Sequence, residues 1–134
     1  MTKLADIEGV GPAYAAKLEE TGVKDEEALL SMGSTPKGRK ELAEKSGISE
    51  KLILKWVNRV DLARIKGIGS EYADLLEVTG VDTVVELATR KPENLVAKMA
   101  EVNETKKLVR KLPTLTQVQD WVKQAKELPR AVNY

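Results

Sequence analysis

Apolar residues recur along this chain at the three- and four-residue spacing of amphipathic helices. Residues 50–64 contain one apolar stripe with charged residues between its members: Leu52, Ile53, Trp56, Val57 and Val60. No segment has the strict alternation that is typical of a half-buried strand. The pattern therefore predicts an all-α fold.

Capping residues set the expected ends of these helices. Asp25, Thr35 and Ser49 each precede an apolar-periodic run, and Gly47 follows one. Such residues satisfy the free backbone groups at helix ends. Beyond the first turns, we expect helices over residues 26–32, 36–46, 50–64, 83–90, 92–102, 104–111 and 117–128.

The chain contains an internal duplication with an offset of 58 residues. Residues 4–23 read LADIEGVGPAYAAKLEETGV, and residues 62–81 read LARIKGIGSEYADLLEVTGV. Twelve of these twenty positions are identical: Leu4/Leu62, Ala5/Ala63, Ile7/Ile65, Gly9/Gly67, Gly11/Gly69, Tyr14/Tyr72, Ala15/Ala73, Leu18/Leu76, Glu19/Glu77, Thr21/Thr79, Gly22/Gly80 and Val23/Val81. Such agreement indicates a repeat rather than chance.

Each copy is predicted to form a short helix, a tight Gly-hydrophobic-Gly turn and a second helix. Pro12 suits the first turn of that second helix, and Ser70 is the expected N-cap in the second copy. Gly22 and Gly80 are expected just beyond the ends of the two helices.

We expect two repeats, residues 1–61 and 62–134, packed as one compact unit about a pseudo-twofold axis or in a superhelix. Residues 50–64 run directly into the second turn, which argues against a flexible linker. Trp121 is the expected counterpart of Trp56, and both are predicted to be buried.

The two turn segments resemble the helix-hairpin-helix motif, hydrophobic-x-x-Gly-hydrophobic-Gly-x-x-x-Ala. The whole chain resembles a bacterial family of unassigned function, domain of unknown function 4332, which has two such motifs. The likeness includes the blocks KGR…LAE…GISEKLILKWVN and RIKGIG…YADLLE…GVDTV.ELA, within residues 37–58 and 64–88. The resemblance implies the fold more firmly than any activity.

The resemblance also implies a phosphate-binding role for the turns. Backbone N–H groups at a helix N-terminus attract anions, and glycine lets a phosphate approach closely. Such a site would hold DNA through its backbone without reading bases. The residues implicated are Gly9, Val10 and Gly11 in the first copy and Gly67, Ile68 and Gly69 in the second, joined there by Arg64, Lys66 and Ser70.

Local charge favours the second turn over the first. Residues 1–31 carry a net charge of −4 and residues 62–89 a net charge of −3, while residues 37–59 and 90–111 each carry +4. Asp6, Glu8, Glu19 and Glu20 are expected to repel a phosphate near the first turn, whereas Arg64 and Lys66 flank the second. The whole chain carries only +1, so no global basic field indicates a nucleic-acid partner.

The basic segments offer a separate route to a ligand. They form binding patches, or they are solvated helix faces, or they pair with the acidic halves. A further alternative is head-to-tail self-association of the acidic half of one copy with the basic half of another. The residues of these possible patches are Lys37, Arg39, Lys40, Lys106, Lys107, Arg110 and Lys111.

Composition argues against an enzyme. The chain has no Cys and no His, which removes thiol nucleophiles, imidazole bases and the usual zinc ligands. No nucleotide-binding fingerprint is present, so we expect no catalytic residue, cofactor or metal. No membrane-spanning stretch or signal peptide is evident, and we expect a cytoplasmic protein.

The expected function is therefore non-catalytic binding, with double-stranded DNA as the first candidate ligand. The alternative is a protein–protein adaptor, or a self-associating scaffold, that uses the hairpins only for packing. The expected oligomeric state is a monomer or a weak homo-oligomer.

Overall fold

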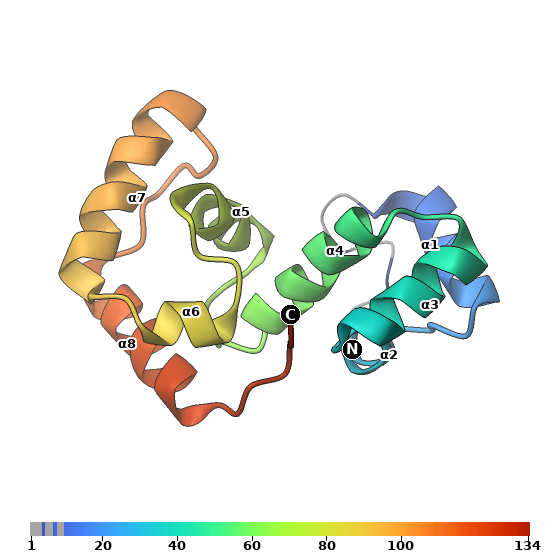
Figure 1. The fold of residues 1–134 in the computed structure, drawn as a ribbon. Helices are drawn as coiled ribbons and strands as arrows, with labels where there is room; N and C mark the ends of the chain where they lie inside the picture. The colour runs from blue at the N-terminus through green and yellow to red at the C-terminus, as the bar shows by residue number, and fades with distance from the viewer. Residues whose placement is uncertain (1–3, 5–6, 8–9) are drawn as a thin grey trace. The chain divides into compact units, whose positions relative to one another are not determined.

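The computed structural model describes residues 4, 7 and 10–134, and for Ser70 only the backbone. Within these residues the chain is all-helical, with no strand (Figure 1). The helices are α1 (Gly11–Glu20), α2 (Glu26–Met32), α3 (Pro36–Ser46), α4 (Glu50–Leu62), α5 (Ser70–Thr79), α6 (Val84–Ala88), α7 (Pro92–Lys106) and α8 (Leu115–Glu127).

The chain divides into two compact units. Unit 1 comprises Met1–Asp61 together with Ala131–Tyr134, and unit 2 comprises Leu62–Arg130. In unit 1, α3 packs against α1 and α2, and in unit 2, α7 and α8 pack against each other and against α5 and α6 respectively. Each unit has its own hydrophobic core.

A tryptophan lies at the centre of each core. Trp56 on α4 and Trp121 on α8 are each 1% exposed, as the apolar pattern predicted. Tyr14 packs on Trp56 with ring centroids 5.1 Å apart and planes 55° apart, and Tyr72 packs on Trp121 at 5.3 Å and 54°. The matched pairs confirm Trp121 as the counterpart of Trp56.

Most predicted caps are present. Asp25 Oδ1, Thr35 Oγ1 and Ser49 Oγ accept backbone N–H bonds at the starts of α2, α3 and α4. Gly47 and Gly80 end α3 and α5 with left-handed backbones, which glycine adopts without steric cost. Thr114 and Gln117 form a reciprocal capping box at the start of α8.

One expected helix and one expected N-cap are wrong. Residues 104–111 do not form a separate helix, because α7 continues to Lys106 and ends with Lys107 in the left-handed region (φ 49°). The Asn103 side chain then bonds both backbone groups of Val109, accepting at 3.0 Å and donating at 3.1 Å. Ser70 is the first helical residue of α5 rather than its N-cap, which is Gly69.

Candidate functional site

The segment between α4 and α5 makes two successive tight turns, and we call residues 62–70 the second turn. The Ile65 N–H donates to the Leu62 carbonyl at 3.1 Å, and the Ile68 N–H donates to the Ile65 carbonyl at 3.2 Å. All three side chains are buried in the core of unit 2. Because every third side chain points inward, the residues between them face outward.

The outward residues of the second turn include two glycines and two cations. Lys66, Gly67 and Gly69 are exposed, and Arg64 is half-buried. The Arg64 guanidinium donates from Nη2 to the Pro129 carbonyl at 2.8 Å. Lys66 is therefore the more accessible of the two predicted cations.

Gly67 is required by the fold itself. Its φ is +100°, a backbone conformation that residues with a Cβ rarely adopt. A Cβ at this position would also lie 2.8 Å from Trp121 Nε1 on α8. This glycine thus lets the turn pack directly on the core tryptophan.

Gly69 has no comparable structural constraint. Its φ of −95° and ψ of −171° are extended values open to any residue, and an added Cβ would meet nothing within 4 Å. It is the N-cap of α5 and supplies no side-chain cap. Among the described residues, the Gly69 N–H has no acceptor. The structure therefore leaves open space and a donor at this helix start.

Gln124 on α8 holds the second turn in place. The Lys66 N–H donates to Gln124 Oε1 at 2.9 Å, and Gln124 Nε2 donates to the Lys66 carbonyl at 3.1 Å. Nε2 also donates to Asp120 Oδ2 at 2.8 Å, which orients the amide group. Sequence reasoning missed Gln124, because no local signal links it to a turn 58 residues away.

The described hydrogen bonds of the first turn repeat those of the second, although Gly11 has φ +67° where its counterpart Gly69 has φ −95°. The Ile7 N–H donates to the Leu4 carbonyl at 3.1 Å, and the Val10 N–H donates to the Ile7 carbonyl at 3.0 Å. All three residues are buried, and Gly11 begins α1 with φ +67°. Gly9, the remaining predicted site residue, lies outside the described residues. Val10 and Ile68 thus anchor equivalent turns in separate cores.

Two of the four acidic residues expected to repel a phosphate at the first turn, Glu19 and Glu20, lie away from it. Glu19 and Glu20 are at the last turn of α1, about 12 Å along the helix axis from Gly11. That separation exceeds the roughly 8 Å screening length at physiological salt, so they repel an anion at the turn only weakly. Asp6 and Glu8 lie outside the described residues. Next to the second turn, Glu71 is the second residue of α5 and is exposed.

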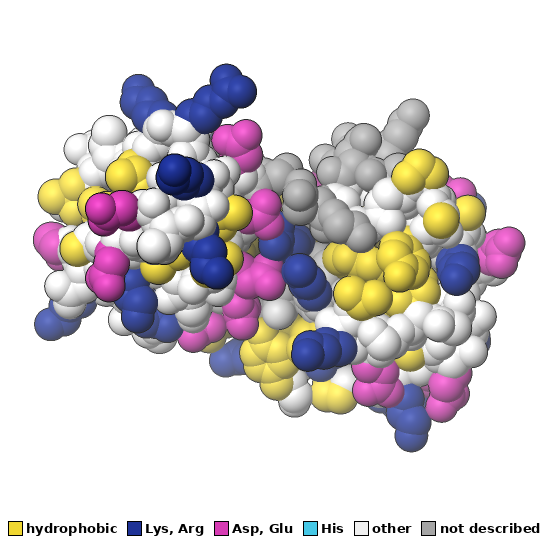
Figure 2. Space-filling model, turned by 90° about the horizontal axis from the view of Figure 1, so that it is seen from above, with side chains coloured by type: hydrophobic (Ala, Val, Ile, Leu, Met, Phe, Trp, Pro, Cys, Tyr) yellow, Lys and Arg dark blue, Asp and Glu magenta, His cyan; other side chains and the backbone are white. Residues whose placement is uncertain are grey.

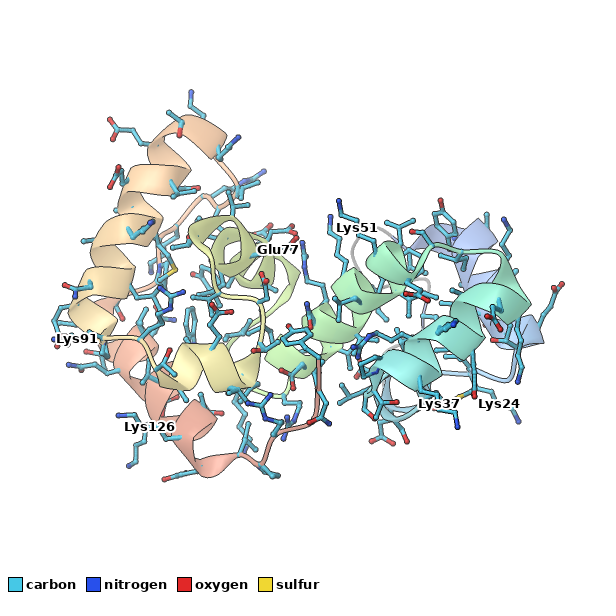
Figure 3. The ribbon with its side chains drawn as sticks, viewed as in Figure 1. Lys24, Lys37, Lys51, Glu77, Lys91 and Lys126 are labelled. Carbon is cyan, nitrogen blue, oxygen red and sulfur yellow. The ribbon has the colours of Figure 1, made fainter. Side chains whose placement is uncertain are left out.

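The first predicted basic patch loses its central member. Arg39 is 5% exposed and donates to the Gly33 carbonyl from Nη1 and to the Asn133 carbonyl from Nη2, both at 2.8 Å. It is therefore a buried cation with backbone partners and does not contribute to an exposed basic patch. Lys37 and Lys40 are exposed, and Lys37 projects from the start of α3 (Figure 3).

The second predicted patch remains exposed at the end of α7 and beyond it. Lysines in a last helical turn interact favourably with the negative end of the helix dipole, which is a structural reason for their presence there. On the face shown in Figure 2, cations and carboxylates are interspersed rather than separated into areas of one sign. The exposed residues of this patch are Lys106, Lys107, Arg110 and Lys111.

The described part of the chain offers neither a metal site nor a membrane span. No group of three or more Asp or Glu side chains there is arranged to hold a metal ion. No helix there combines the length and the apolar character that crossing a membrane requires.

Comparison with known proteins gave one family. The sequence model of a domain of unknown function (DUF4332) matches residues 8–128. The chain belongs to the DUF4332 family. Neither the curated proteins nor the solved structures contain a match to it. The DUF4332 match covers the second turn and α8 with Gln124, and it ends before residues 131–134.

Proposed function

We propose that this DUF4332 protein is a non-catalytic DNA-binding protein that holds the duplex backbone at the second turn. In this proposal the two turns are the hairpins of helix-hairpin-helix motifs. Lys66, Gly67, Gly69 and Ser70 face the phosphate, while Ile68 anchors the turn in the core.

The observation that carries the proposal is the open start of α5. An N-terminal helix end carries partial positive charge and free N–H donors, and phosphates bind at such ends. At Gly69 the N–H has no acceptor among the described residues, and a Cβ added there would meet no atom within 4 Å apart from those of its two chain neighbours. The exposed Lys66 adds a full positive charge beside it.

The same features predict what this site does not do. Its donors are backbone amides and a lysine, which contact phosphates and carry no sequence information. Binding is therefore independent of base sequence, and it weakens as salt rises. Arg64 plays a supporting part, because its guanidinium is already bonded to the Pro129 carbonyl.

The test is fluorescence polarisation with a labelled duplex of arbitrary sequence at about 50 mM salt. We expect Lys66→Glu to weaken binding about tenfold, because it removes a cation at the phosphate and adds a repelling carboxylate. Lys91→Glu makes the same charge change at an exposed lysine beside α7 (Figure 3), and we expect it to have a much smaller effect. Equal effects of the two variants, or no binding by the wild type, would refute the proposal.

A further inference from the structure

Residues 131–134, which we call the docked segment, belong to unit 1 although they follow α8 of unit 2. Val132 is 3% exposed and is part of the buried cluster that includes Leu29, Leu42 and Val57. A short segment that follows α8 thus contributes a side chain to the core of unit 1. The docked segment lies outside the residues that match the family.

The backbone of the docked segment is held on both sides. The Asn133 N–H donates to the Ser34 carbonyl at 2.8 Å, and the Asn133 carbonyl accepts from Arg39 Nη2 at 2.8 Å. Arg39 is itself fixed by its bond to the Gly33 carbonyl in the loop between α2 and α3. Pairing of an extended segment through its main chain is a common mode of peptide recognition.

Val132 is buried, whereas Asn133 and Tyr134 are exposed, and of these two only Tyr134 makes a side-chain hydrogen bond or ring contact among the described residues. The Tyr134 hydroxyl donates to Asn58 Oδ1 on α4 at 3.2 Å, and its ring lies 6.0 Å from Arg39 Cζ. At that distance the guanidinium and the ring attract each other. Val132 is 3% exposed and Tyr134 is 64% exposed, so the surface selects chiefly at position 132, and Tyr134 adds these two contacts at its edge.

Arg39 requires a hydrogen-bond acceptor from whatever segment occupies this surface. Burial lowers the pKa of its guanidinium, against the opposing influence of Tyr134 and Glu50. An arginine nevertheless keeps its charge at neutral pH, so its N–H groups need acceptors. Removal of the docked segment would leave Nη2 without the Asn133 carbonyl, which is costly for a buried charged donor.

We infer that unit 1 carries a peptide-recognition surface, bounded by Ser34, Arg39 and Asn58, and that the docked segment is its internal ligand. The external partner that fits the surface is an extended segment with valine or a similar aliphatic residue followed two positions later by tyrosine. The inference concerns unit 1 alone and does not depend on DNA binding at the second turn.

The internal ligand competes with an external one. A segment tethered in the same chain acts at an effective concentration in the millimolar range. An external peptide therefore binds the wild type weakly and binds more tightly once the docked segment is displaced. We expect at least a tenfold difference between these two affinities.

The test uses a fluorescein-labelled peptide, Arg-Ala-Val-Asn-Tyr, and the full chain carrying Asn133→Pro. Proline has no N–H to donate to Ser34, so the variant weakens docking of its own segment. We expect the variant to bind the peptide at least tenfold more tightly than the wild type does. The control peptide, Arg-Ala-Asp-Asn-Tyr, should bind neither protein, because its carboxylate would enter the apolar site of Val132.

Three outcomes would overturn the inference. One is a folded Asn133→Pro variant that binds both peptides equally or not at all. Another is an unfolded variant whose circular dichroism and melting temperature do not recover with millimolar peptide, since binding to the native state must stabilise it. The third is a concentration-dependent dimer of the wild type that Val132→Asp abolishes without any gain in peptide binding, which would make a second copy the occupant.

Discussion

The fold requires a glycine at position 67 but not at position 69. Substitutions at these two positions can therefore distinguish an effect on stability from an effect on binding. Gly67→Ala must adopt a positive φ and push against Trp121 Nε1, so we expect a loss of about 2–4 kcal/mol in the free energy of unfolding. Gly69→Ala meets no neighbour and needs no unusual backbone angle. Its cost at an N-cap is at most about 1 kcal/mol.

For DNA binding we expect the direct effect to come from Gly69→Ala, whereas Gly67→Ala acts mainly on stability. Gly69→Ala places a methyl group where a phosphate would approach, so we expect weaker duplex binding by a protein of nearly normal stability. Urea unfolding and fluorescence polarisation on the same samples measure both quantities. Duplex binding of Gly69→Ala at the wild-type level would mean that no phosphate approaches Gly69.

Single residues also show where sequence reasoning stops. The repeat and the apolar pattern were sufficient to predict that Trp56 and Trp121 are buried counterparts. Counting cations by segment could not show that Arg39 is buried, because its acceptor on Asn133 lies 94 residues away. The burial of a charge depends on tertiary partners, and those partners carry no local pattern.

At the level of the element, α8 is the support of the second turn. Gln124→Ala removes two hydrogen bonds to the Lys66 backbone, and we expect a loss of about 1–2 kcal/mol in the free energy of unfolding. Gln119→Ala, an exposed change on the same helix, should cost less than about 0.5 kcal/mol. We further expect faster hydrogen exchange at the Lys66 amide in Gln124→Ala, because its acceptor is lost.

The functional consequence of that support can be separated from global stability. Under conditions where Gln124→Ala remains fully folded, we expect weaker duplex binding because the turn is less rigidly held. Gln119→Ala should bind as the wild type does. Suppose the Lys66 amide exchanges faster in Gln124→Ala but the variant binds DNA normally. The hydrogen bonds from Gln124 then stabilise the fold and do not support DNA binding.

Helix ends illustrate which parts of an element are predictable. The starts of α2, α3 and α4 follow from a capping residue and its neighbours within three positions, so a single sequence contains the necessary information. The end of α7 depends on Lys107 in a left-handed conformation and on the contact of Asn103 with Val109. Neither residue is a strong breaker, and the charged run after α7 had the composition of a helix.

At the level of the whole molecule, duplication has produced two units with matched cores and unequal turns. The buried triplets, the turn hydrogen bonds and the Tyr–Trp pairs correspond between the units. The charges beside the turns do not, because Lys66 in the second copy replaces Glu8 in the first. The features that the two units share are those required for core packing. The charges that differ lie beside the turn where we propose that the phosphate binds.

This asymmetry predicts a shallow dependence of DNA binding on salt. If the second turn is the site, Lys66 and the start of α5 neutralise about two phosphates. The logarithm of the DNA-binding constant should then fall with the logarithm of the salt concentration with a slope near −2. If the exposed patch after α7 binds instead, its four cations predict a slope near −4. Polarisation titrations between about 25 and 200 mM salt distinguish these values. Lys66→Glu should reduce the magnitude of the slope by about one, and an unchanged slope would place the phosphate contacts elsewhere on the molecule.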